Sequence, residues 1–234
     1  MTIQERVDAI DWDRVSADLD ERGWATTGPL LSAEEREALV SAYDEDSQFR
    51  STVVMARHGF GKGEYRYFAY PLPELVGALR KALYARLTPV ANRWRVRLGI
   101  GYPLPAEHAE YLEQCHTAGQ RRPTPLILRY GPGDYNCLHQ DLYGDLSFPL
   151  QAAFLLSDQA EFEGGEFVLT EQRPRMQSRV QVVPLEAGEA VIFAVNHRPV
   201  EGTKGTYRVT MRHGVSPVRR GSRHTLGIIL HDAA

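Results

Sequence analysis

Cysteine and long apolar runs are scarce in this chain of 234 residues. Its two cysteines, Cys115 and Cys137, are too few for a disulfide framework and lack the C-x-x-C spacing of a zinc or redox site. No apolar run approaches the roughly 20 residues that cross a bilayer. The first 15 residues have no basic end followed by an apolar stretch, so they do not form a secretory signal. We therefore expect a cytoplasmic protein with no membrane partner.

The chain also lacks a large excess of either charge, because its net charge is only −3. The distribution is nevertheless uneven. Residues 1–171 hold 17 basic and 26 acidic residues, whereas residues 172–223 hold 10 basic and 3 acidic residues, a net charge of +7. A local basic segment can bind an anion that the whole chain repels. Its arginines either form solvated hairpin tips or bind substrate phosphates, and Arg173 and Arg175 are the candidates for phosphate binding.

The rest of the composition, 43% hydrophobic and 24% charged, is typical of a globular protein with a sizeable core. Ser32 and Glu35 form a capping box, which predicts a helix beginning at residue 33. Residues 1–120 are expected to be mainly helical, with a strand at 24–31 and irregular strands in the aromatic-rich stretch 51–71. Helices are predicted at residues 10–22, 33–43, 75–97 with a possible interruption at Pro89, and 106–117.

From residue 121 onward, short β-rich runs alternate with glycine and proline. They cover residues 124–130, a run into His139, and residues 148–156, 165–172, 178–185, 189–195, 207–215 and 223–230. Eight short strands with turn signals between them indicate a sandwich, barrel or jelly roll. No internal repeat or low-complexity linker divides the chain. We predict one α+β domain over residues 1–234, in which the mainly helical residues 1–120 brace a β core at 121–234.

His139 and Asp141 are two residues apart, so on an extended strand both side chains leave the same face and can hold one ion. His213 lies 72 residues further on, in another β-rich run. Two neutral imidazoles and one carboxylate leave three coordination positions open, as non-haem Fe(II) requires for a bidentate cosubstrate and O₂. Zinc prefers tetrahedral sites with one open position. The alternative is a histidine and a carboxylate paired at the surface.

Arg223 and Thr225 share one face of the last predicted strand. The arginine can form a bidentate pair with a carboxylate, and the threonine hydroxyl can add one hydrogen bond. Tyr130, on the strand before His139, can supply another hydroxyl. Tyr143 follows Asp141 closely and either stacks on a substrate base or packs in the core.

The sequence resembles Fe(II)- and 2-oxoglutarate-dependent dioxygenases, whose motif is His-x-Asp, a distal His and a downstream Arg-x-Ser/Thr. The run Tyr130-Gly-Pro-Gly-Asp-Tyr-Asn-Cys-Leu-His-Gln-Asp141 resembles AlkB-like demethylases. The spacing from His213 to Arg223 instead resembles prolyl hydroxylases. The combination is similar to a prokaryotic group assigned to oxidation of damaged nucleic acid. This resemblance implies a double-stranded β-helix, a jelly-roll or cupin-like core, with Fe(II), 2-oxoglutarate and O₂ as cofactors.

Two positions depart from the AlkB pattern, which has asparagine at Leu128 and a second arginine at Ile229. The contacts to 2-oxoglutarate would therefore centre on Arg223, Thr225 and Tyr130. The predicted function is an oxygenase that demethylates alkylated bases in DNA or RNA, a repair activity without an obligate protein partner. The alternatives are hydroxylation of a protein side chain or small metabolite, and a non-catalytic β-helix that binds a metal or ligand.

Overall fold

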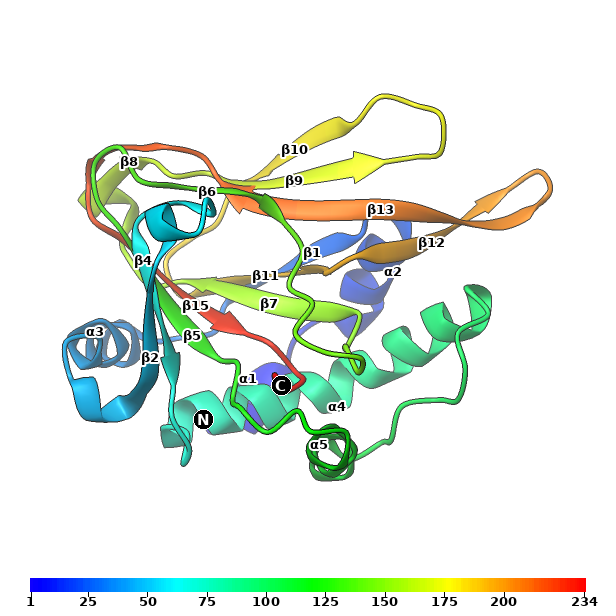
Figure 1. Cartoon of the computed structure of the whole chain (residues 1–234), viewed down its shortest axis with the longest axis horizontal. Helices are drawn as coiled ribbons and strands as arrows, with labels where there is room; N and C mark the ends of the chain where they lie inside the picture. Colours follow the sequence, from blue (N-terminus) through cyan, green and yellow to red (C-terminus); the bar gives the residue numbers. More distant parts are fainter.

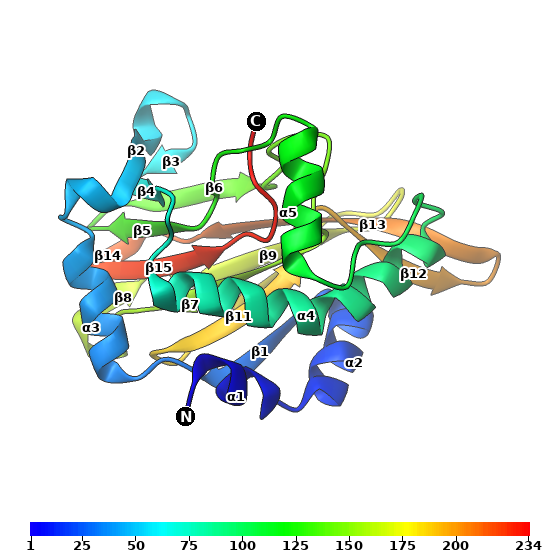
Figure 2. The same cartoon turned by 90° about the horizontal axis from the view of Figure 1, so that it is seen from below.

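The computed structural model describes residues 1–234, which form two antiparallel sheets and a layer of helices. In Figure 1 the smaller sheet lies above the larger one, and most of the helices lie below it. Figure 2 shows the molecule from the helical side, with α1, α2, α4 and α5 across the larger sheet and α3 beside one of its ends. The predicted α+β class is confirmed.

The larger sheet has seven strands, and its order brings the last strand into the middle. The order is β1 (Trp24–Pro29), β11 (Glu189–Ala194), β7 (Leu150–Leu155), β15 (Arg223–Ile228), β5 (Leu126–Tyr130), β4 (Glu64–Phe68) and β2 (Phe49–Val54). Of the irregular strands expected within 51–71, β2 and β4 are therefore regular members of this sheet. Residues 1–120 are less purely helical than predicted, because β1, β2 and β4 supply both edges.

The smaller sheet carries the two predicted histidine ligands. Its order is β10 (Arg179–Val183), β9 (Phe167–Gln172), β13 (Gly205–Val215), β6 (Tyr135–His139) and β3 (Gly61–Lys62), and β12 (His197–Gly202) also pairs with β13. A separate ribbon joins β14 (Val218–Gly221) to β8 (Phe162–Gly164). The strands β8, β12 and β14 were not predicted, because they are short or rich in polar residues.

The chain forms five helices, and the first three begin at capping side chains. They are α1 (Ile3–Asp8), α2 (Trp12–Arg22), α3 (Ala33–Ala42), α4 (Glu74–Arg97) and α5 (His108–Thr117), with 3₁₀ turns at Asp46–Gln48, Met55–Arg57 and Gln159–Glu161. The predicted box of Ser32 and Glu35 caps α3, and a second box of Thr2 and Glu5 caps α1, which was not predicted. Helix α4 runs through Pro89 without a break. No helix is both long and apolar enough to span a membrane.

Strand β7 shows how the layers form, because all six of its residues are buried. Successive strand residues point to opposite faces. Leu150, Ala152 and Phe154 accordingly join the core between the sheet and the helices, whereas Ala153 and Leu155 join the core between the sheets. The first of these cores includes residues from Ile3 to Leu230. The single-domain organisation stays a prediction, and this continuous core supports it.

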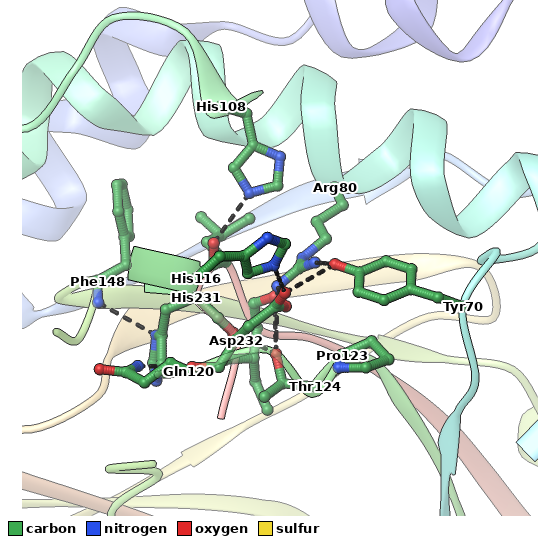
Figure 3. A network of polar contacts seen from close by, with 12 residues as sticks. Tyr70, Arg80, His108, His116, Gln120, Pro123, Thr124, Phe148, His231 and Asp232 are labelled. Atoms are coloured by element: carbon green, nitrogen blue, oxygen red, sulfur yellow. Dashed lines mark hydrogen bonds and ion pairs between the residues drawn. The ribbon is translucent and has the colours of Figure 1, made fainter. Parts of the chain in front are cut away.

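A buried ion pair ties α4 to the segment that follows β15 (Figure 3). Arg80 contacts the Asp232 carboxylate at 2.8 Å and donates from Nε to the carbonyl of Ile229. The hydroxyl of Tyr70 and a ring nitrogen of His116 contact the other carboxylate oxygen at 2.9 and 2.8 Å. Both members of the ion pair are buried. The segment after β15 is therefore fixed to the helical layer by charge as well as by packing.

Replacing Asp232 by alanine leaves the Arg80 guanidinium buried without its carboxylate, which costs about 3–5 kcal/mol. We expect urea denaturation of Asp232→Ala to show a loss of this size in the free energy of unfolding. The matched control is Asp8→Ala, whose ion pair with Arg86 is exposed to solvent. A loss no greater than that of the control would show that the buried pair does not stabilise the fold.

Candidate active site

His139, Asp141 and His213 are brought together, with one possible ligand atom of each within 4.8 Å of the others. His139 ends β6 and stands opposite His213 in the antiparallel register of β6 and β13. The Nε2 atoms of His139 and His213 lie 3.5 and 3.3 Å from the two oxygens of Asp141. Asp141 lies just beyond β6, not on the expected strand, yet its side chain joins the two histidines. Asp141 and His213 are buried.

Hydrogen bonds and charges orient the three groups of the cluster. His139 Nδ1 is 2.7 Å from the carbonyl of Cys137 and therefore donates its proton there, which turns Nε2 toward Asp141. Burial would lower the pKa of His139, but the hydrogen bond and Coulomb attraction of Asp141 raise it. Burial lowers the pKa of His213, which favours its neutral form. Burial would raise the pKa of Asp141, but hydrogen bonds and Coulomb attraction from the two histidines hold it well below its ordinary value. Two imidazoles thus face one carboxylate.

Two further side chains hold Asp141. Tyr143 donates its hydroxyl to Oδ1, and Gln151 donates its amide to Oδ2, both at 2.7 Å. Tyr143 was predicted as a substrate contact, which stays a prediction; it lines the cavity, and its hydroxyl is bound to Asp141. Gln151 was not predicted. The signal for it is a single polar residue inside the apolar run 148–156, because a buried polar group needs a partner.

Arg223 is 1% exposed and forms no ion pair. Its Nη1 donates to Thr225 at 2.7 Å, and its Nε is buried without a hydrogen-bond partner. Tyr130 stands opposite Arg223 in the register of β5 and β15, and its buried hydroxyl also lacks a partner. A buried cation without a counter-ion is costly. This end of the site is therefore suited to an anion with carboxylate oxygens.

One cavity of about 310 Å³ joins these groups. Its lining includes the three clustered residues, Tyr143, Gln151, Arg223, Thr225 and Tyr130. The cavity lies between the two sheets, since β6 and β13 supply one wall and β5, β7 and β15 supply the other. The predicted metal and cosubstrate residues thus share one enclosed space.

Arg173 and Arg175 do not line this cavity. Arg173 donates from Nε to Glu171 at 2.8 Å, and the buried Glu171 carboxylate also binds Arg198. Arg175 lies in the turn between β9 and β10, and Figure 1 shows this hairpin at the upper edge of the molecule. The sequence could not show that Arg173 has an acidic partner or that Arg175 lies in the turn of this hairpin. Their binding of substrate stays a prediction that this placement does not favour.

The cavity opening carries an aromatic pair that was not assigned from the sequence. Phe60 lines the cavity yet is 48% exposed, and its ring stacks on His58 at 5.3 Å. The carbonyl of Phe60 accepts the N–H of Cys137, which fixes this segment against the strand that ends at His139. The aromatic cluster at 60–70 is therefore split between the core and the opening.

Residues 63–233 match the family described as an oxygenase, catalysing oxidative methylation of damaged DNA. The chain belongs to this oxygenase family. Its relatives include an uncharacterized protein from each of two strains of Mycobacterium tuberculosis, CDC 1551 / Oshkosh and H37Rv. Each is 46% identical over 168 residues, which cover 71% of this chain and 72% of the relative.

Several solved structures are similar to the oxygenase in fold. It is similar to a 2OG-Fe(II) oxygenase family oxidoreductase from Burkholderia pseudomallei, with a TM-score of 0.54, 18% identity and coverage of 95% and 93% of the two chains. A prolyl hydroxylase from Trichoplax adhaerens, in complex with a peptide fragment, has a TM-score of 0.56 and 14% identity. The match covers 96% of this chain and 90% of that chain. A prolyl-4-hydroxylase from Pseudomonas putida has a TM-score of 0.52 and 18% identity, and the match covers 92% of this chain and 96% of that chain. The predicted jelly-roll core is confirmed.

The chemistry of the donor set agrees with this family. Two imidazoles and one carboxylate form the facial set of non-haem Fe(II) oxygenases, and the fold is that of 2-oxoglutarate-dependent members. The Fe(II), 2-oxoglutarate and O₂ predicted from the sequence fit this donor set and the unpaired Arg223 beside it.

Gly214 keeps β13 close to β6, because a Cβ there would lie 2.7 Å from the carbonyl oxygen of Asn136. We expect Gly214→Ala to force the two strands apart, lower the free energy of unfolding by about 1–3 kcal/mol, and weaken the binding of a divalent ion. Isothermal titration with Mn(II) and urea denaturation measure the two effects. The matched control is Gly227→Ala, where the nearest atom is a Leu126 side-chain carbon at 3.4 Å. Unchanged Mn(II) affinity would contradict the expectation.

Proposed function

We propose that His139, Asp141 and His213 hold Fe(II), that Arg223, Thr225 and Tyr130 bind 2-oxoglutarate, and that the substrate is an alkylated base in nucleic acid. The observation that carries the cosubstrate assignment is a buried arginine without a counter-ion, in one cavity with a His-Asp-His cluster. A ligand with a keto-acid group at one end and a carboxylate at the other would suit both ends of the cavity, because the keto-acid group can bind a metal ion and the carboxylate can pair with Arg223. The assignment of each residue rests on this fit.

The bound cofactors supply one reaction: a substrate C–H bond, O₂ and 2-oxoglutarate give an alcohol, succinate and CO₂. If the carbon is an N-methyl group on a base, the resulting hydroxymethyl group leaves as formaldehyde and restores the base. The protein's own residues provide position and a dry cavity. Arg223 donates to the distant carboxylate, Thr225 holds the guanidinium in place, and the Tyr130 hydroxyl gains the partner it lacks.

The family description supports nucleic acid as the substrate, and so does the opening of the cavity. Phe60 lines the cavity there and stacks on His58, and stacking on aromatic side chains is a common way to hold an unpaired base. Arg57 and Lys62 flank the pair in the sequence, are exposed and form no ion pair. A base in a duplex would have to leave the helix to reach the cavity. A single strand is therefore the favoured form.

The alternative substrate is a protein side chain or a small metabolite. The ion pairs of the basic segment favour it, because they leave fewer cations to bind phosphates. Arg173, Arg179 and Arg198 surround Glu171, while Arg219 and Arg220 contact Glu166 and Glu163. Among this segment's cations outside the cavity, the ones without an ion pair are Arg175, Lys204, Arg208 and Arg212.

Anaerobic titration of apo-protein with Fe(II) and 2-oxoglutarate should give a visible charge-transfer band. We expect His139→Ala to lose the band. Arg223→Met should weaken 2-oxoglutarate binding at least tenfold, because it removes a charge-assisted bidentate pair. The same variant should leave the melting temperature of apo-protein unchanged or raised, since it removes an unpaired buried charge. The matched control is Arg220→Met, an exposed arginine on β14. No band in the wild type would overturn the cosubstrate assignment.

The substrate is tested by succinate release with alkylated single-stranded oligonucleotides, proline-containing peptides and small metabolites. We expect formaldehyde release from the oligonucleotides, and a KM at least several-fold higher for Phe60→Ala, because base–aromatic stacking contributes about 1–3 kcal/mol per base. Tyr102→Ala is the matched control, since Tyr102 is 90% exposed and lies outside the cavity lining. Turnover of peptides or metabolites but not oligonucleotides would move the assignment to the alternative.

A further inference from the structure

The Asp141 carboxylate is held on both of its oxygens by neutral donors. Tyr143 approaches Oδ1 and Gln151 approaches Oδ2, each at 2.7 Å. Hydrogen bonds to an ionised acceptor are roughly twice as strong as those between neutral groups. With one donor on each oxygen, rotation of the carboxylate about its Cβ–Cγ bond breaks both contacts, so the group is confined to one orientation.

Gln151 reaches Asp141 because of where it lies in β7. Its neighbours Leu150 and Ala152 face the helices, so the Gln151 side chain faces the space between the sheets. The amide nitrogen is also 3.4 Å from Nε2 of His213, while the amide oxygen is buried without a partner. A reversed amide would place its oxygen against the carboxylate. The charge on Asp141 therefore fixes the orientation of Gln151, and the rigid strand fixes its position.

Tyr143 is held in the loop between β6 and β7 by the segment that follows β15. Its carbonyl accepts the N–H of Ala234, and its ring lies 6.1 Å from the ring of His231. Further along the same loop, the N–H of Phe148 donates to Nδ1 of His231 at 3.1 Å. Figure 3 shows His231 and its contact with Phe148 beside the Arg80–Asp232 pair. The hydroxyl that contacts Asp141 is thus fixed to the helical layer through this segment.

We propose that Tyr143 and Gln151 are positioning residues that hold the Asp141 carboxylate ready for the metal ion. The inference rests on the proposed function, in which Asp141 is a ligand of Fe(II). Neither residue needs to contact substrate or cosubstrate. The Tyr143 hydroxyl thus supports Asp141, and the same role explains why a glutamine stands in an apolar strand.

The test measures metal affinity in apo-protein, without 2-oxoglutarate, O₂ or substrate. Titration with Co(II) followed by its visible d–d absorption gives a dissociation constant for each variant. We expect Tyr143→Phe and Gln151→Leu each to weaken Co(II) binding about 10–100-fold, the usual effect of losing a residue that supports a metal ligand. The matched control is Tyr65→Phe, which also lines the cavity but has no hydrogen bond to Asp141. Its affinity should stay within twofold of the wild type.

A second readout separates positioning from general stability. The melting temperature of each apo-variant is measured, and metal affinity is compared well below it, where all variants are folded. Co(II) affinities of Tyr143→Phe and Gln151→Leu within twofold of the wild type would overturn the inference. If the wild type and His139→Ala bind Co(II) equally, the proposed metal site itself is wrong. If His139→Ala loses Co(II) and the two variants keep it, only the positioning role is wrong.

Discussion

The antiparallel register of β6 and β13 is the constraint on which the candidate active site depends. It places His139 opposite His213, and a slip of one residue would turn one of these rings to the outer face of the sheet. Gly214 permits the close approach of the strands beside this pair. The geometry of the cluster is therefore a property of the sheet, and the loop after β6 has only to bring Asp141 back toward it.

A second constraint is electrostatic. The cavity places an ionised carboxylate and an uncompensated arginine in one enclosed space. In a low-dielectric interior charges are costly, and a ligand of opposite sign reduces that cost. Asp141 is suited to a cation and Arg223 to an anion. Binding both ligands at once would remove both penalties, so the apo-protein has lower stability than a purely apolar interior would give it.

The sequence predicted most of the β core, because alternation along strands is a local property. It predicted His139, Asp141, His213 and Arg223 of the cavity lining through their resemblance to a known motif. It did not predict Gln151, whose role depends on β7 lying opposite β13. It predicted that Arg173 contacts a substrate, because the ion pair of Arg173 with the buried Glu171 forms only in the folded sheet. Strands β2 and β4 were predicted only as irregular strands, because their regular structure depends on pairing. Strand β2 pairs with β4, and β4 pairs with β5. Contacts between distant segments therefore account for what was missed.

The position of β15 in the larger sheet has a consequence for how the protein is made. This strand lies between β7 and β5, which precede it by many residues. During synthesis the sheet is left open at its centre until residues 223–228 emerge from the ribosome, and such non-local pairing makes folding slow. Arg223 and Thr225 arrive with this strand. A nascent chain thus lacks the arginine end of the cavity until this last strand of the core is in place, so an incomplete chain cannot form the cavity.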